Sequence, residues 1–226
     1  MLKKIKDFGI NFSKSIGIIV LYLLLQIILG ALYENLLNSS NEFISNCSLM
    51  LIYTLLLLII GLFFIPNLVE QFHYFKKENI KIAFKNWGLG FLCMFVSNLY
   101  LTYFIGNIAS NEASNRELLI ASPILSIIIM VVLAPALEEI VFRLNLKRTF
   151  KNKYVFCLVS ALLFGGMHLV SASSLKELLY IIPYGSLGFF FAKAYYETDN
   201  IYTSIFAHMF HNGLSVLIIL MGMALL

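Results

Sequence analysis

The chain contains seven apolar stretches that are each close to the length needed to cross a bilayer. A helix of about 20 residues spans a hydrocarbon core of ~30 Å, because it rises 1.5 Å per residue. The stretches lie near residues 16–33, 48–66, 87–108, 119–143, 154–170, 178–195 and 201–225. Of the 226 residues, 60% are hydrophobic and 12% are charged, against about 25% charged in a soluble domain. The sequence therefore predicts an all-α polytopic membrane protein with about seven transmembrane helices.

The basic residues predict how these helices are oriented. The first apolar stretch is longer than a signal-peptide core and no small-residue cleavage site follows it, so we interpret it as a retained span. If the N-terminus is cytoplasmic, 14 of the 16 Lys and Arg residues fall in inner segments, and only Arg116 and Lys176 fall in outer loops. Short cytoplasmic loops retain Lys and Arg, so this orientation is predicted. The net charge of +4 then reflects membrane topology, and no nucleic-acid partner is expected.

The chain divides into two parts that differ in whether ionisable residues lie inside their apolar stretches. Residues 1–118 hold three apolar stretches without ionisable residues inside them, and residues 119–226 hold four stretches, three of which carry acids or histidines. We expect the second part to be the functional core. The cysteines Cys47, Cys93 and Cys157 are isolated, so neither a disulfide framework nor a thiolate metal site is indicated.

Two adjacent glutamates interrupt the fourth apolar stretch, in PALEEIVFRLN. A charge in hydrocarbon costs on the order of 3 kcal/mol on insertion scales, so intramembrane charges usually have a function. Glu139 and Arg143 are an i, i+4 pair with the acid first, which is the favourable order for an ion pair. Glu138 points ~100° away around the helix and has no equally good partner there. A purely structural charge cluster explains Glu139 and Arg143 but leaves Glu138 unexplained.

Histidines of the later stretches are predicted at the same depth as Glu138. Glu138 lies ~18 Å before the turn at Lys151 to Lys153, and His168 lies ~22 Å after it, at 1.5 Å per residue. In the last stretch, His208 and Asn212 share a helix face, with His211 on the flank. An acid, two imidazoles and a carboxamide could thus converge in a cavity open to the inner side. Such a set can activate water and stabilise an oxyanion.

Three motifs in this order resemble one family of membrane proteins. EEIVFR fits EExxxR, FGGMH (Phe164 to His168) fits FxxxH, and HMFHN (His208 to Asn212) fits HxxxN, over roughly residues 119–215. The pattern is similar to the CPBP family, which includes CAAX prenyl proteases and bacteriocin-processing or Abi-type membrane proteins. The resemblance implies an intramembrane endopeptidase that cleaves a membrane-associated peptide or protein. It implies that Glu138 and His168 activate water, that His208 and Asn212 stabilise the oxyanion, and that Glu139 and Arg143 support them; His211 has no implied role.

The sequence leaves the cofactor and two other functions open. No cofactor is predicted, because direct glutamate catalysis satisfies the motifs, but Glu138, His168 and His208 also match a catalytic zinc set by ligand type. A second interpretation is a non-proteolytic immunity or sensor-binding membrane protein. A third is a small transporter, although neither repeats nor broken helices are evident beyond Pro135. The Lys-, Ile- and Asn-rich chain is typical of a bacterial cell-membrane protein, and the oligomeric state is left open.

Overall fold

A computed structural model describes residues 2–37, 42–106 and 108–224, and these residues form helices joined by short connections. The α-helices of the first half are α1 (Leu2–Leu37), α2 (Glu42–Leu62), α3 (Ile65–His73), α4 (Lys77–Ile105) and α5 (Ser110–Ala121). One continuous helical rod follows, made of α6 (Pro123–Ile127), η1 (Ile128–Leu133), α7 (Ala134–Glu139), η2 (Ile140–Leu144) and α8 (Asn145–Lys147). The last elements are α9 (Lys153–Met167), η3 (Leu175–Tyr180), α10 (Ile181–Thr198) and α11 (Ile201–Ala224). The all-α fold class is confirmed, with no strand among the described residues.

Fewer helices than predicted are long and apolar enough to cross a membrane. Four qualify within the described residues: Lys3–Asn35, Lys77–Ile105, Pro123–Lys147 and Ile201–Gly222. A fifth span is possible if the pair Cys47–Leu62 and Ile65–His73, bent by 88°, is counted as one. The expected count of seven is therefore not confirmed. The stretch expected at 154–170 is helical for only 15 residues, Lys153–Met167, about 22 Å and thus short of the ~30 Å core.

Sequence-encoded breaks set several boundaries of these elements. The span expected at 119–143 begins instead at Pro123, because residues up to Ala121 belong to α5 and Pro123 occupies the first turn of the new helix. Gly106 ends α4 with a φ of 82°, a left-handed conformation that glycine adopts without steric cost. Asn152 begins α9 by accepting hydrogen bonds from the backbone N–H groups of Tyr154 and Val155. The end predicted for the last span, residue 225, lies outside the described residues.

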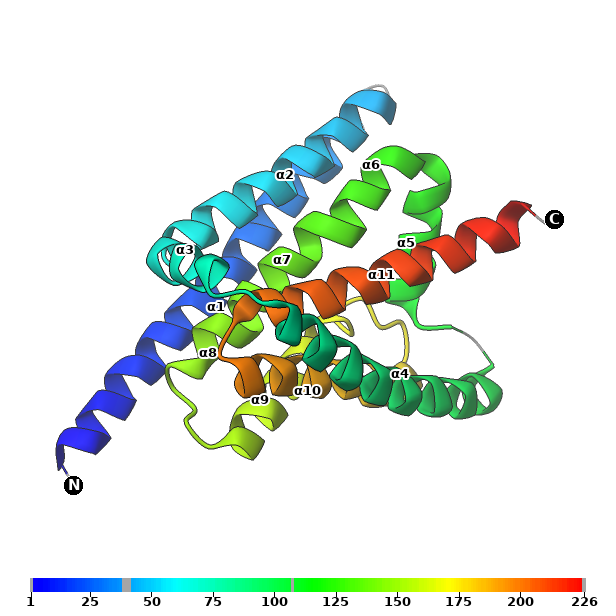
Figure 1. Ribbon diagram of the computed structural model, residues 1–226. Helices are drawn as coiled ribbons and strands as arrows, with labels where there is room; N and C mark the ends of the chain where they lie inside the picture. Colours follow the sequence, from blue (N-terminus) through cyan, green and yellow to red (C-terminus); the bar gives the residue numbers. More distant parts are fainter. Residues whose placement is uncertain (1, 38–41, 107, 225–226) are drawn as a thin grey trace.

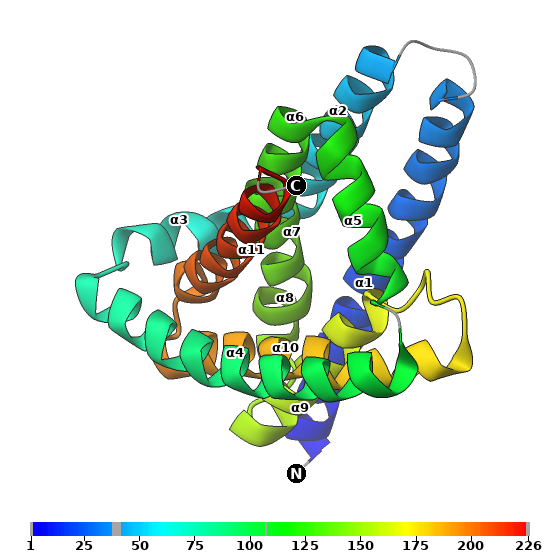
Figure 2. The ribbon, with the colours of Figure 1, turned by 90° about the vertical axis from the view of Figure 1, so that its right-hand side faces the viewer.

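The helical rod from Pro123 to Lys147 occupies the middle of the molecule. Figure 1 shows α1 and α2 along one side of the rod and α11 along the other, and Figure 2 shows α4 and α10 lying together across the rod. The buried core contains Tyr22, Ile60, Phe142 and Phe156, from α1, α2, η2 and α9. Figure 1 shows α3, the turn after α8 and the N-terminus toward one end, and α5 and the C-terminus toward the other. We call the first of these the basic end, because Lys147, Arg148 and Lys151 lie there.

Candidate active site

The two glutamates lie in a short α-helical segment between two π-helical turns. α7 ends with Glu138 and Glu139, and η1 and η2 flank it. Pro135 has no backbone N–H, so the turn before it cannot make a regular α-helical hydrogen bond there, and η1 is the wider turn that results. Single π-helical turns inside α-helices are frequent at functional sites. The sequence indicated a distortion at Pro135, but gave no signal for the second π-helical turn after Glu139.

Glu139 and Arg143 form the ion pair that their spacing predicts. Arg143 Nη1 lies 3.1 Å from Glu139 Oε1, and both side chains have 0% exposure. Arg143 Nη2 also donates to the backbone carbonyl of Gly188, 3.2 Å away on α10. Removing one partner of such a buried pair leaves an uncompensated charge, which is strongly destabilising. The pair therefore links the central rod to α10 as well as neutralising Glu139.

Two aromatic rings enclose the guanidinium of Arg143. Its Cζ lies 4.4 Å from the ring centroid of Phe164 and 5.8 Å from that of Phe191. These cation–π contacts need α9 and α10 to approach closely. Gly188 allows that approach, because a Cβ there would lie 2.9 Å from the Phe164 ring. The phenylalanine of the FxxxH motif thus packs against the arginine of the EExxxR motif.

His208 on α11 stands between the two glutamates. Its Nδ1 lies 2.9 Å from Glu139 Oε1, and its Nε2 lies 3.8 Å from Glu138 Oε2. Because Glu139 is paired with Arg143 and accepts as a carboxylate, Nδ1 carries the proton and donates. Nε2 is then the nitrogen that faces Glu138. Phe191 stacks on the imidazole at 4.9 Å and fixes its plane.

Asn212 connects α11 to the first π-helical turn. Its Nδ2 donates to the backbone carbonyl of Met130 in η1, 2.8 Å away. A carboxamide nitrogen has two N–H groups, so the second is not used in this bond. His208 and Asn212 therefore contact the rod on either side of Pro135. The HxxxN spacing places both on the same face of α11, as the sequence predicted.

His168 lies at the C-terminal end of α9, with a defined tautomer when it is neutral. Its Nδ1 is 2.9 Å from the backbone carbonyl of Phe164. A carbonyl only accepts, so Nδ1 donates and Nε2 is left with the lone pair. The ring packs against Phe164 and against Tyr184 of α10, at 4.5 and 4.7 Å between centroids. His168 is thus held as a hydrogen-bond acceptor at Nε2, which suits a base.

One cavity of about 570 Å³ joins these residues, and we call it the glutamate cavity. Its lining includes Glu138, His168, His208 and Asn212, so the four residues predicted as catalytic lie around one space. From helix rise, Glu138 and His168 were predicted to lie at similar depth, and both line this cavity. Glu138 is 18% exposed at its side chain, whereas Glu139 and Arg143 have no exposure.

The glutamate cavity extends toward α5, which differs from the expected inner opening. Glu112 and Arg116 of α5 and Asn98 of α4 are among its lining residues. None of the described residues that line it belongs to 143–153, the segment at the basic end. From the sequence, the segment that forms α5 was expected only as an outer loop containing Arg116. α5 instead folds back beside the cavity as a helix.

His211 contacts Trp87 of α4 beside the glutamate cavity, a contact that the sequence did not predict. Trp87 Nε1 of α4 donates to His211 Nδ1 at 3.4 Å, and His211 lines the glutamate cavity. The accepting Nδ1 places the proton of a neutral His211 on Nε2. An i, i+4 aromatic series at Trp87, Phe91 and Phe95 on α4 was the available sequence signal. That series packs beside α11 and orients this second histidine.

The zinc alternative does not fit the observed side-chain positions. Glu138, His168 and His208 have suitable ligand types. Among the described residues, however, no three His, Cys, Asp or Glu side chains lie close enough together to hold a metal ion. His208 also uses Nδ1 for Glu139. A reaction that uses the side chains alone and one that uses zinc are kept as alternatives for this site.

The comparison with known families agrees with the motif assignment. Residues 120–214 match the family model described as "Type II CAAX prenyl endopeptidase Rce1-like". This segment, which we call the CPBP segment, is similar to that family. The match contains the whole EExxxR, FxxxH and HxxxN series, which confirms the resemblance seen in the sequence. The CPBP segment is also the part that contributes the four catalytic candidates of the glutamate cavity.

Two relatives extend the similarity beyond the CPBP segment. An uncharacterized protein of Mycoplasma capricolum subsp. capricolum is 29% identical over 208 residues, covering 85% of this chain and 60% of the relative. The Bacillus subtilis (strain 168) protein named "Putative membrane peptidase YdiL" is 28% identical over 152 residues, covering 63% of this chain and 59% of the relative. The chain thus spans about 60% of the length of these relatives. No solved structure matches it.

Proposed function

We propose that this protein is an intramembrane endopeptidase that hydrolyses a peptide bond of a membrane-associated peptide or protein. The observation that carries the proposal is the convergence of Glu138, His168, His208 and Asn212 on one cavity. The CPBP family description and the relative named as a membrane peptidase support the same class of activity. The bacterial relatives and the apolar helices favour a location in a bacterial cell membrane.

Glu138 and His168 are proposed to activate the attacking water. Of the two glutamates in EExxxR, Glu138 is the one that lines the cavity, and Arg143 is paired with Glu139 instead, so the Glu138 carboxylate is available as a base. His168 offers the Nε2 lone pair, because Nδ1 is committed to Phe164. The water oxygen forms a bond to the scissile carbonyl carbon while its proton passes to this acid–histidine pair. The pair then returns the proton to the leaving amine as the C–N bond breaks.

His208 and Asn212 are proposed to stabilise the oxyanion of the tetrahedral intermediate. Asn212 has its second N–H for this purpose. His208 donates from Nε2 only when it is doubly protonated, because Nδ1 already donates to Glu139. Donors held in place before the reaction need no reorganisation as charge develops on the oxygen.

The experiment that tests this function compares membrane peptides from cells that express wild-type protein or Glu138→Gln. The proposal predicts at least one peptide or trimmed protein that is present only with the wild type. A non-proteolytic immunity or sensor-binding protein would give the same peptides in both cells and keep its biological effect in the variant. A transporter would also leave the peptides unchanged but would lose ion or solute flux. Growth with a chelator and then with added zinc tests metal dependence in parallel.

A further inference from the structure

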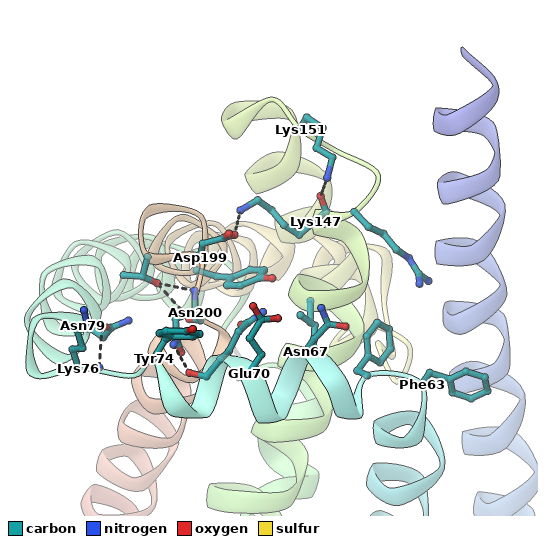
Figure 3. Close-up of a pocket in the computed structure, with 16 residues that line it drawn as sticks. Phe63, Asn67, Glu70, Tyr74, Lys76, Asn79, Lys147, Lys151, Asp199 and Asn200 are labelled. Atoms are coloured by element: carbon teal, nitrogen blue, oxygen red, sulfur yellow. Dashed lines mark hydrogen bonds and ion pairs between the residues drawn. The ribbon is translucent and has the colours of Figure 1, made fainter. Parts of the chain in front are cut away.

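A second cavity of about 650 Å³ lies at the basic end, apart from the glutamate cavity, and we call it the lysine cavity. Its lining combines residues from α3, the start of α4, the end of the central rod and the turn between α10 and α11. Figure 3 shows α3 as its floor, with Lys147 and Lys151 above and Lys76 at one end. Residues of the glutamate cavity are not among those that line it within the described chain.

The lining carries an excess of positive charge. Four cationic side chains, Lys76, Lys147, Arg148 and Lys151, face two acidic ones, Glu70 and Asp199, so the excess is two charges. Lys147 Nζ is held by Asp199 at 2.8 Å and lies 4.3 Å from the ring centroid of Tyr196. Lys151 is exposed and donates to the backbone carbonyl of Lys147 at 3.3 Å. An ammonium has three donors, so Lys151 has two more for a ligand.

The floor of the lysine cavity is an amphipathic helix with two different faces. Ile65, Val69 and Phe72 are 48%, 53% and 65% exposed and follow each other at helical spacing on one face of α3. Asn67 and Glu70 lie on the other face and line the cavity. α3 is bent by 88° from α2, a helix of membrane-spanning composition. A helix so oriented, with apolar residues on one side and polar residues on the other, is typical of the membrane–water interface.

The cavity is built into the fold, because its floor is fixed to α11. Gln71 Oε1 of α3 accepts from the backbone N–H of Ile201, and the Gln71 carbonyl accepts from Asn200 Nδ2, both at 2.6 Å. One end of the lysine cavity is apolar, unlike the part that carries the charged side chains. Phe63, which is 59% exposed, closes the end nearest α1 in Figure 3. A ligand with an anionic group and an apolar tail would match both parts.

We propose that the lysine cavity binds the phosphate headgroup of an anionic phospholipid, with the acyl chains leaving past Phe63. The charge excess recognises the phosphate, and the polar face of α3 provides hydrogen bonds to the rest of the headgroup. The interfacial position of α3 places the cavity at the level of lipid phosphates. Each Lys or Arg near an anionic surface contributes about 1 kcal/mol, which is about fivefold in affinity. This binding is independent of whether the protein cleaves peptides.

The test is a lipid titration of the full-length protein in neutral detergent, followed by thermal unfolding. Phosphatidylglycerol should raise the unfolding temperature to a plateau, because it binds the folded state, and phosphatidylcholine should not. Lys76→Gln with Lys151→Gln should weaken the apparent affinity about 20-fold or more, since two lysines are removed. The matched control is Lys3→Gln with Lys85→Gln, which removes the same charge from exposed positions outside the cavity lining. It should retain the wild-type affinity.

Three results would overturn the proposal. Equal stabilisation by phosphatidylcholine would show that the effect is not specific for an anionic headgroup. An equal loss of affinity in the control pair would show that overall surface charge is responsible. Inorganic phosphate that gives the same plateau without lipid would show that the ligand is a free anion.

Discussion

Glu139 Oε1 contacts both His208 Nδ1, at 2.9 Å, and Arg143 Nη1, at 3.1 Å. One carboxylate oxygen therefore connects the HxxxN and EExxxR motifs, which are on different helices. Glu139 neutralises a buried guanidinium and also sets the tautomer and orientation of His208. Glu138, its neighbour in sequence, lines the glutamate cavity instead. Two adjacent glutamates thus have different surroundings, and different effects of mutation are expected.

Glu139→Gln is expected to act mainly on stability. The change leaves Arg143 buried without its counter-charge, and breaking such a pair costs about 3–5 kcal/mol. The unfolding temperature in detergent should fall strongly, and Arg143→Ala should give a similar loss. Glu112→Gln is the control, because Glu112 and Arg116 form an exposed i, i+4 pair worth about 0.3–0.5 kcal/mol. Comparable small shifts for Glu139→Gln and Glu112→Gln would contradict the structural role.

His208→Ala and Asn212→Ala are each expected to lower kcat by about 10² to 10³, with less effect on KM, because an oxyanion donor acts in the transition state. Both donors serve one oxygen, so the double variant should lose less than the product of the two single losses. His211→Ala should retain substantial activity. The measurement is turnover of a defined peptide in liposomes. Normal cleavage by His208→Ala and Asn212→Ala would show that neither stabilises the oxyanion.

Glu177 is expected to hold α5 in place in a pH-dependent way. Its carboxylate accepts hydrogen bonds from the backbone N–H and hydroxyl of Ser110 and from the hydroxyl of Ser173. The Ser173 hydroxyl and then the Ser110 groups lower the pKa of Glu177 to about 2. Because the pKa of Glu177 is lower in the folded state, its ionised carboxylate stabilises the fold at pH values above the unfolded-state pKa of about 4.3. This stabilisation is lost as the pH falls toward 2.

Glu177→Gln should therefore be less stable than wild type at pH 7, and the difference should narrow as the pH falls from about 4.3 to about 2. The readout is the unfolding temperature of both proteins across this range. Glu117→Gln, a nearby charge change on α5, serves as the control. A difference between wild type and Glu177→Gln that is constant over the whole range would show that ionisation of Glu177 is not involved.

Access to the glutamate cavity is expected from the α5 side. The test uses a background without Cys47, Cys93 and Cys157. The variant Asn98→Cys should react with a membrane-impermeant thiol reagent that is added on the side of the membrane where α5 lies. This is expected because Asn98 is exposed and lines the cavity. Lys151→Cys at the basic end should react from the opposite face. If Asn98→Cys is modified only by reagent supplied from the basic end, the cavity opens in the direction first expected from the sequence.

The residues of the candidate site could be predicted because they are ionisable or polar side chains within otherwise apolar stretches. Acids and histidines inside apolar stretches are few, so motif spacing and helix rise were enough to place Glu138, His168, His208 and Asn212 around one space. The Glu139–Arg143 pair followed from i, i+4 geometry alone. The contact between Glu139 and His208 was not predictable, because it depends on how α11 packs against α7.

The helix count and the cavity direction were harder to predict for a related reason. Hydrophobicity indicates whether a segment is surrounded by apolar groups but not the direction in which it runs, so the stretch at 154–170, which forms the short helix α9, could not be distinguished from a span by composition. The apolar stretch beginning at 119 concealed the break at Ser122 and Pro123, where α5 ends and the central rod begins. α5 is polar enough to resemble a loop, yet it folds beside the cavity through the contact of Ser110 with Glu177.

The most direct test of the central claim is cleavage of a defined membrane peptide by purified protein in liposomes, with wild type, Glu138→Gln and the exposed control Glu78→Gln. General acid–base groups contribute about 10²- to 10⁴-fold in rate. Glu138→Gln should lose activity in that range or completely while keeping the wild-type unfolding temperature, and Glu78→Gln should cleave normally. Wild-type cleavage by a well-folded Glu138→Gln protein would contradict the assignment of Glu138 as the catalytic base.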